Sequence, residues 1–181
     1  MDPIKILEKY YDTTSDTYKI LFPHLILVRD KALEIAKNIA HLHPDLKFIE
    51  EASMIHDIGI FRTNAPDIAC HGDEPYIKHG VLGREILENE GFKVHALICE
   101  RHVGVGLTKD EIIAQNLPLP QRDMIPQSIE EKIICIADKF FSKNPKKQGK
   151  IFTLDDIRAE VERYGEGPKN RLEEYIKLLK L

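Results

Sequence analysis

The feature that most constrains this chain is a histidine next to an aspartate, His56-Asp57, inside the apolar run MIHDIGI at residues 54–60. Burial of an ionised carboxylate is costly unless the group is paired or binds a metal ion. Asp57 offers a hard oxygen and His56 an imidazole nitrogen, a combination that suits iron, manganese or zinc. Neighbouring residues of a regular helix point about 100° apart. Both side chains can therefore reach one ion only near a helix end, where we expect Gly59 to let the backbone turn.

The composition is typical of a soluble globular protein and argues against several functional classes. The 181 residues are 43% hydrophobic and 31% charged, which allows one domain with a sizeable core. The net charge of −4 gives no overall attraction to nucleic acid or to an anionic membrane. The three cysteines form no CxxC pair, the N-terminus lacks a signal-peptide pattern, and no stretch approaches the roughly 20 apolar residues of a membrane span. We therefore expect a cytoplasmic protein with no membrane partner, and a nucleic-acid partner is disfavoured.

Helical periodicity dominates the chain, and we find no strand pattern of useful length. A short helix is expected over residues 4–11. Pro23 suits the first turn of the next helix, and Asp45 is a candidate cap for the helix that leads to the His-Asp pair. Asp73 with Pro75 looks like the start of a further helix. Other helices are expected over residues 94–103, after Thr108 and Ser128, and over residues 154–164 and 169–181, so the expected fold is all-α.

Six histidines and aspartates lie on, or next to, the apolar faces of five of these helices. They are His24, His56, Asp57, His79, His102 and Asp138. A single histidine on an apolar face is more often a satisfied core residue than a ligand. Six such residues, two of them adjacent, are much harder to explain as packing.

The ordered set resembles the H…HD…H…H…D pattern of the HD-domain superfamily of metal-dependent phosphohydrolases. More narrowly, the segments HDIG at 56–59, ERHVGVG at 100–106 and IAD at 136–138 look like those of poorly characterised HDIG-domain proteins. The resemblance runs from about Pro23 to Phe141. It implies a helical bundle around a metal centre, in a single domain over residues 1–181. The core would span about 23–141, with a short N-terminal helix and a C-terminal helical extension.

The resemblance also implies two divalent transition-metal ions. His24, His56, Asp57 and Asp138 would hold one ion, and the catalytic Asp57 would bridge to a second. His79 and His102 would complete the second site. Family members that lack these two histidines tend toward a single ion, whereas this chain has both, which favours two ions. Iron or manganese is favoured, and zinc, nickel or magnesium are alternatives because histidine and aspartate serve several metals.

The expected reaction is hydrolysis of a phosphomonoester or phosphodiester by a metal-activated hydroxide. The substrate would be a nucleotide or another small phosphorylated metabolite. One alternative is a mixed-valent di-iron oxygenase, since a few HD proteins activate oxygen. The other is a non-catalytic nucleotide-binding sensor. The amphipathic C-terminal helix leaves a homo-oligomer open.

Three further residues are candidates for binding the substrate because they flank ligand positions: Arg62, Arg101 and Lys139. His71, in a loop eight residues before His79, is a fourth candidate near the site; it could bind substrate, add a ligand or donate a proton to the leaving group, and the alternative is a surface residue. Many HDIG-type enzymes have a lysine directly after the glycine, whereas this chain has Ile60, and Arg62 could substitute for that lysine. His95, two helical turns before His102, is a competing candidate for that ligand position. The Lys-rich segment 142–150 is expected to be a mobile, solvated loop.

Overall fold

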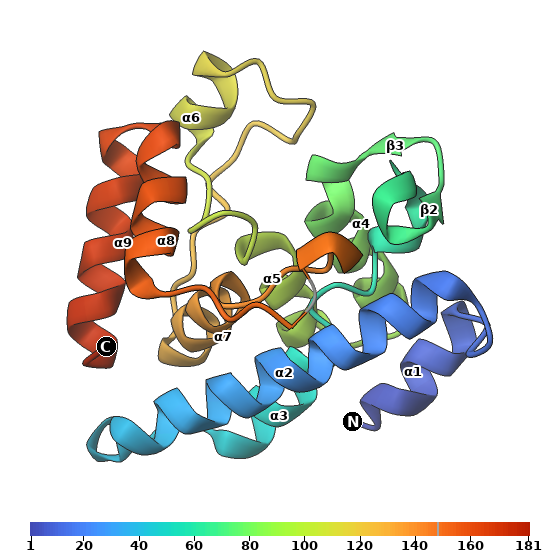
Figure 1. The fold of residues 1–181 in the computed structure, drawn as a ribbon, viewed down its shortest axis with the longest axis horizontal. Coiled ribbons are helices and arrows are strands. Elements are labelled where there is room, and N and C mark those ends of the chain that lie inside the picture. The colour runs from blue at the N-terminus through green and yellow to red at the C-terminus, as the bar shows by residue number, and fades with distance from the viewer. Residues whose placement is uncertain (148) are drawn as a thin grey trace.

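The computed structural model describes residues 1–147 and 149–181 and is built mainly from helices (Figure 1). The α-helices are α1 (Pro3–Tyr10), α2 (Asp16–Asn38), α3 (Leu46–Ser53), α4 (His79–Asn89), α5 (Lys93–Arg101), α6 (Lys109–Ala114), α7 (Ile129–Lys139), α8 (Leu154–Val161) and α9 (Glu166–Leu179). Short 3-10 turns cover Ala40–Leu42, Ile60–Arg62, Pro66–Ile68, Tyr76–Lys78, Pro145–Lys147 and Glu162–Tyr164. The expected all-α fold is confirmed.

A small sheet follows the His-Asp turn. It consists of β1 (Thr63–Ala65), β2 (Cys70–His71) and β3 (Glu74–Pro75), in the order β2-β1-β3. β1 pairs antiparallel with β2 and parallel with β3. The prediction that a helix starts at Asp73 and Pro75 was wrong, because Glu74 and Pro75 pair with β1. The chain then passes through a 3-10 turn before α4 begins at His79.

Helix capping follows the sequence at most positions. The side chain of Asp45 accepts a hydrogen bond from the backbone N–H of Phe48, which confirms the predicted cap of α3. The predicted start at Pro23 was wrong: α2 begins at Asp16, where the Ser15 hydroxyl caps the helix by accepting from the N–H of Tyr18. Pro23 therefore lies inside a long helix and leaves one carbonyl of the preceding turn without its usual donor.

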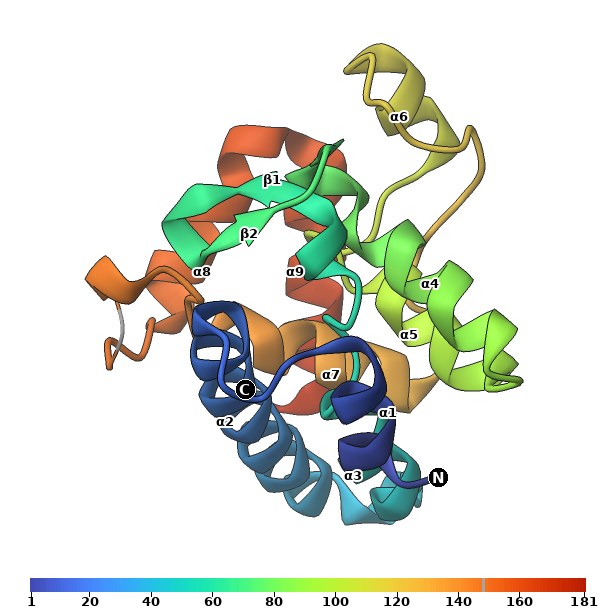
Figure 2. The same cartoon turned by 90° about the vertical axis from the view of Figure 1, so that its right-hand side faces the viewer.

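Two hydrophobic clusters form the interior. The first lies between the C-terminal half of α2 and helices α3, α7, α8 and α9, and the second lies between α1, the N-terminal half of α2, the His-Asp turn, α4 and α5. Figure 2 shows α4 and α5 side by side. Gly80 and Gly83 allow this close approach, because a Cβ at Gly80 would lie 2.5 Å from the carbonyl oxygen of Cys99. On α2, His24 lies between Leu21 of the second cluster and Val28 of the first, so the fold places this histidine where the two clusters meet.

Candidate metal centre

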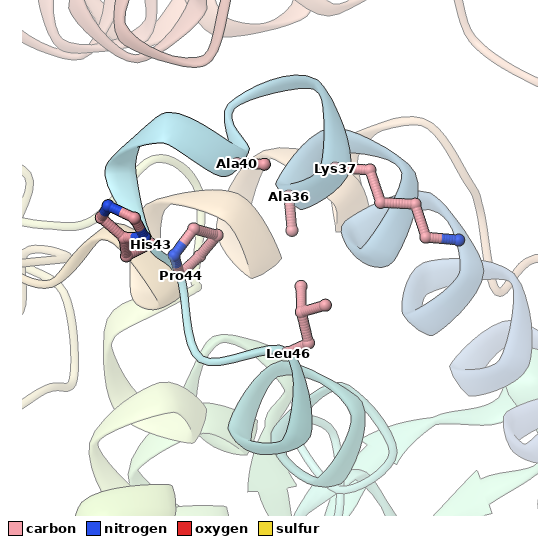
Figure 3. Close-up of a pocket in the computed structure, with 6 residues that line it drawn as sticks. All are labelled: Ala36, Lys37, Ala40, His43, Pro44 and Leu46. Carbon is pink, nitrogen blue, oxygen red and sulfur yellow. The ribbon is translucent and has the colours of Figure 1, made fainter.

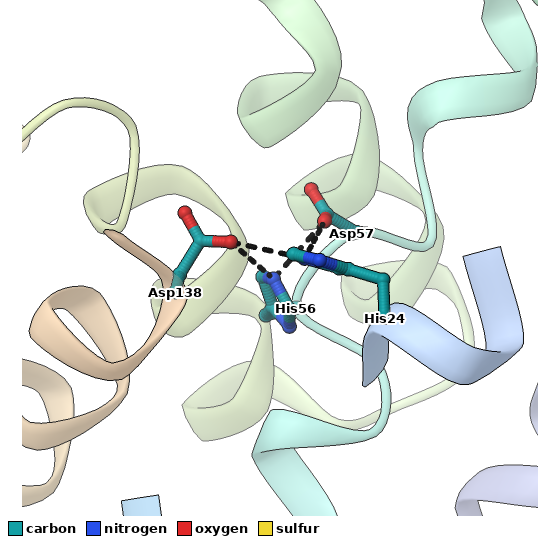
Figure 4. Close-up of side chains that lie close together, drawn as sticks. All are labelled: His24, His56, Asp57 and Asp138. Carbon is teal, nitrogen blue, oxygen red and sulfur yellow. Dashed lines mark ion pairs between the residues drawn. The ribbon is translucent and has the colours of Figure 1, made fainter. Parts of the chain in front are cut away.

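Four buried side chains from separate parts of the chain form a ring of possible ligand atoms (Figure 4). His24 comes from α2, His56 and Asp57 from the turn after α3, and Asp138 from the last turn of α7. His24 Nε2 lies 3.3 Å from Asp57 Oδ2 and 3.0 Å from Asp138 Oδ1. His56 Nε2 lies 3.0 Å and 3.5 Å from the same two oxygens. Ligand atoms held at about 2.0–2.2 Å by one ion stand roughly 2.8–3.6 Å apart in octahedral or tetrahedral geometry, so this ring fits one ion.

A second group shares Asp57 and uses its other oxygen. Asp57 Oδ1 lies 3.5 Å from His79 Nε2 and 3.4 Å from His102 Nε2, and the two Nε2 atoms are 3.1 Å apart. The three atoms form a triangle with the spacing expected around a shared ion. The carboxylate of Asp57 thus faces the ring with Oδ2 and the histidine pair with Oδ1.

Backbone carbonyls fix the orientation of three imidazoles. His56 Nδ1 lies 2.8 Å from the carbonyl oxygen of Ser53, His79 Nδ1 lies 2.7 Å from that of Tyr76, and His102 Nδ1 lies 3.2 Å from the carbonyl of Ile98 in its own helix. A carbonyl can only accept, so each Nδ1 carries a proton, and in the neutral imidazole Nε2 then presents a lone pair. The Nε2 atoms of His79 and His102 therefore cannot hydrogen-bond each other, and a cation between them would satisfy both.

The charge state of the cluster suits a divalent cation. Burial alone would raise the pKa of Asp57, but attraction to His56 and Lys143 holds that pKa well below its usual range. Burial lowers the pKa of His79 to about 3, so this imidazole is neutral, as a metal ligand must be. For His56, the carboxylates of Asp57 and Asp138 outweigh burial and raise the pKa to about 9, so an ion there would replace a proton. Among the described residues, Asp57 Oδ1, Asp138 Oδ1 and His56 Nε2 have no hydrogen-bond partner. These buried groups are compatible with divalent metal binding.

The turn that carries His56 and Asp57 follows the C-terminus of α3, as expected from the need for both side chains to reach one place. The role predicted for Gly59 was wrong, since its φ of −82° is open to any residue. Glycine is needed there for space: a Cβ at Gly59 would lie 2.3 Å from the carbonyl oxygen of His79 and 2.4 Å from the backbone nitrogen of Gly83. The turn thus packs directly against the backbone of α4.

The four residues predicted to bind substrate lie in different surroundings. Arg62 is partly exposed and pairs with Glu85 at 2.8 Å. His71 is exposed on β2. Arg101 pairs with Glu131 at 2.8 Å, whereas Lys139 Nζ lies 2.9 Å from Asp138 Oδ2. The structure therefore brings only Lys139 of these four into direct contact with the two ligand groups, and the substrate-binding roles stay predictions.

The sequence analysis missed one residue of the cluster. Lys143, expected in a solvated loop, has a side chain only 11% exposed, and its Nζ lies 2.6 Å from Asp57 Oδ2. Lys146 in the same segment is 82% exposed, as expected. The segment 142–150 also includes Gln148, which lies outside the described residues. The competing histidine, His95, belongs to neither ligand group and lies 3.2 Å from Glu51 instead.

A surface hollow beside the C-terminal end of α2 contains none of the six candidate ligands (Figure 3). Its walls are formed by Ala36, Lys37, Ala40, His43, Pro44 and Leu46.

Among the described residues, no helix combines the length and the apolar composition that a bilayer crossing requires.

Comparisons with known proteins agree with this geometry. An uncharacterised protein of Methanocaldococcus jannaschii is 36% identical over 143 residues, which cover 77% of this chain and 74% of that protein. Two proteins named tRNA (cytidine(56)-2'-O)-methyltransferase are also similar. The one from Picrophilus torridus is 35% identical over 60% of this chain and 29% of its own length, and the one from Thermoplasma volcanium is 32% identical over 67% and 32%. The chain thus spans about a third of these two relatives, and no solved structure gives a significant match. The profile of the HD domain matches residues 21–142, and the chain belongs to the HD-domain family.

Proposed function

We propose that this protein is a metal-dependent phosphohydrolase that works with two divalent ions. The observation that carries the proposal is the placement of Asp57, whose Oδ2 belongs to the ring with His24, His56 and Asp138. Its Oδ1 belongs to the second site, the group with His79 and His102. One carboxylate that faces two ligand sets is the arrangement that a two-metal hydrolase needs.

The residues of the chain would hold this centre in a fixed, water-poor place. His56 and Asp57 are fully buried, while Asp138 and His79 keep 6% and 5% exposure. When bound, two ions supply a hydroxide at neutral pH and offset the negative charge of the phosphoryl group. Asp57 fixes the position of the two ligand sets relative to each other. The backbone carbonyls that accept from Nδ1 of His56 and His79 keep the Nε2 atoms of these two histidines directed inward. No side-chain nucleophile is required.

The substrate class we propose is a small phosphorylated molecule, such as a nucleotide, cleaved at a phosphomonoester or phosphodiester. Access is expected on the side of Asp138 and Lys139, where the exposed fraction of the side chains rises to 8% and 17%. The relatives named as tRNA methyltransferases support testing nucleotides and short RNA fragments beside other phosphoesters.

The test is a phosphoester screen on protein reconstituted separately with manganese, iron, zinc, nickel and magnesium. We expect release of phosphate or of a nucleotide product from wild-type protein and a loss of roughly 100-fold or more in Asp57→Asn, because even residues that only support a metal ligand contribute 10–100-fold. His95→Gln is the matched control, because His95 is a largely buried histidine outside both ligand groups. Hydrolysis that survives in Asp57→Asn would contradict the proposal. Binding of nucleotides without any turnover would identify a sensor, and oxygen-dependent turnover with iron alone would identify an oxygenase.

A further inference from the structure

The ammonium group of Lys143 lies against three atoms of the ring of possible ligands. Its Nζ is 2.6 Å from Asp57 Oδ2, 3.3 Å from His24 Nε2 and 3.6 Å from Asp138 Oδ1. The side chain reaches this place from the segment after α7 and is 11% exposed. Hence one cation of the chain itself occupies the face of the ring.

The same three atoms would bind an ion in the ring. Two cations cannot share them closely, because like charges a few ångströms apart repel by several kcal/mol at roughly the effective dielectric of such sites. The ammonium must therefore leave these atoms when they hold an ion. The four-carbon stem of lysine is flexible, so a rotation of the side chain suffices and the backbone can stay in place.

The displaced ammonium needs another anionic partner, since an unpaired buried charge is costly. The other oxygen of Asp138, Oδ2, already pairs with Lys139 at 2.9 Å. Asp57 Oδ1 faces His79 and His102. Among the described residues, the two carboxylates of the ring thus leave the displaced ammonium no free oxygen. This favours a partner from outside the chain, on the side where Lys139 and Lys143 keep some exposure.

We propose that Lys143 binds the phosphoryl group of the substrate at the metal centre, with its ammonium on oxygens that the ions leave free. This inference rests on the proposed phosphohydrolase function and adds a substrate-binding residue to it. A phosphate oxygen is a strong acceptor, and a lysine next to a metal-bound phosphate forms a charge-assisted hydrogen bond with it.

The test measures binding of inorganic phosphate to metal-loaded protein by calorimetry, beside the metal content of the same samples. In Lys143→Met we expect both ions to stay bound and the dissociation constant for phosphate to rise at least tenfold, in line with the loss of roughly one charged hydrogen bond. Lys143→Arg should keep most of the affinity. Lys146→Met is the matched control, because Lys146 lies in the same segment and is 82% exposed, and it should bind phosphate as the wild type does.

Three results would overturn the inference: wild-type protein that does not bind phosphate, Lys143→Met that binds it as tightly as the wild type, or Lys143→Met that is folded but has lost its ions. The last result would mean that Lys143 supports the ligands themselves. Binding does not depend on turnover. A protein that binds phosphate through Lys143 and hydrolyses no phosphoester would refute the hydrolase but leave the assignment of Lys143 intact.

Discussion

The hydroxyl of Tyr11 connects the first helix of the chain to the turn that carries the His-Asp pair. It donates a hydrogen bond of 2.8 Å to the carbonyl oxygen of Ile58, the residue after Asp57. Tyr11 is 6% exposed and Ile58 is fully buried. Its ring also packs edge-on against Phe61 at 5.1 Å between centroids. Tyr11→Phe removes the hydroxyl and keeps the packing, so it isolates this hydrogen bond.

The expected loss follows from the burial of the carbonyl. Removing the donor to a buried acceptor costs about 1–3 kcal/mol. A chain of 181 residues unfolds with an entropy of about 0.38 kcal/mol/K, at roughly 2.1 cal/mol/K per residue. The melting temperature of Tyr11→Phe should therefore fall by about 3–8 °C. Because the turn holds Asp57, the variant should also bind metal more weakly.

Differential scanning calorimetry of the wild type and two variants tests this prediction. Tyr10→Phe is the control, because the Tyr10 hydroxyl also donates to a single acceptor, Glu90 Oε1, at 2.5 Å. In Tyr10→Phe, Glu90 keeps its exposed pair with Lys9. The loss of folding stability in this variant should therefore be below about 1 kcal/mol. Equal melting temperatures for wild type and Tyr11→Phe, or equal losses in the two variants, would refute the reasoning.

Two further variants test the turn and its surroundings. Gly59→Ala should lower the free energy of unfolding by about 1–3 kcal/mol, the usual cost of overpacking. The reason is that the new Cβ would lie 2.3 Å from the carbonyl oxygen of His79. An unchanged urea midpoint would contradict this prediction and show that α4 can move away. Burial lowers the pKa of His95 more than Glu51 raises it, so His95 takes up a proton more readily in the unfolded chain than in the folded one as the pH falls below about 6.5. Stability from this residue is complete above that pH and is lost below it. When the pH falls from 7.5 to 5.5, the free energy of unfolding should therefore decrease less in His95→Gln than in the wild type. An equal decrease in the two proteins, measured by urea unfolding at both pH values, would contradict this prediction.

The sequence was informative about the ligand cluster because buried polar side chains need a compensating partner. His24 shares its helix face with the buried residues Val28 and Ala32, and Asp138 lies in a helix whose neighbouring residues Ile136 and Ala137 are fully buried. Such positions stand out in a helical pattern. The order of the six residues then matched a known family, whose domain profile the chain fits over residues 21–142.

Other features depend on contacts that local sequence does not specify. Nothing in the Lys-rich segment distinguishes Lys143, which pairs with Asp57, from Lys146, which is 82% exposed. The side chain of Lys143 contacts Asp57 and His24, which are both distant from it in sequence. Likewise Gly59 has an ordinary φ, and its need for glycine comes from the approach of α4. The short strands form because β1 offers backbone partners, although their two or three residues carry no strand pattern.

Metal content per chain, measured by elemental analysis of protein purified without chelator, tests the central claim most directly. We predict about two transition-metal ions in the wild type, since the chain offers two ligand groups. His79→Ala and His102→Ala should each retain one ion, Asp57→Ala should lose both, and His95→Gln should keep both. A wild type that binds no metal even after reconstitution, or Asp57→Ala with full metal content, would contradict the account.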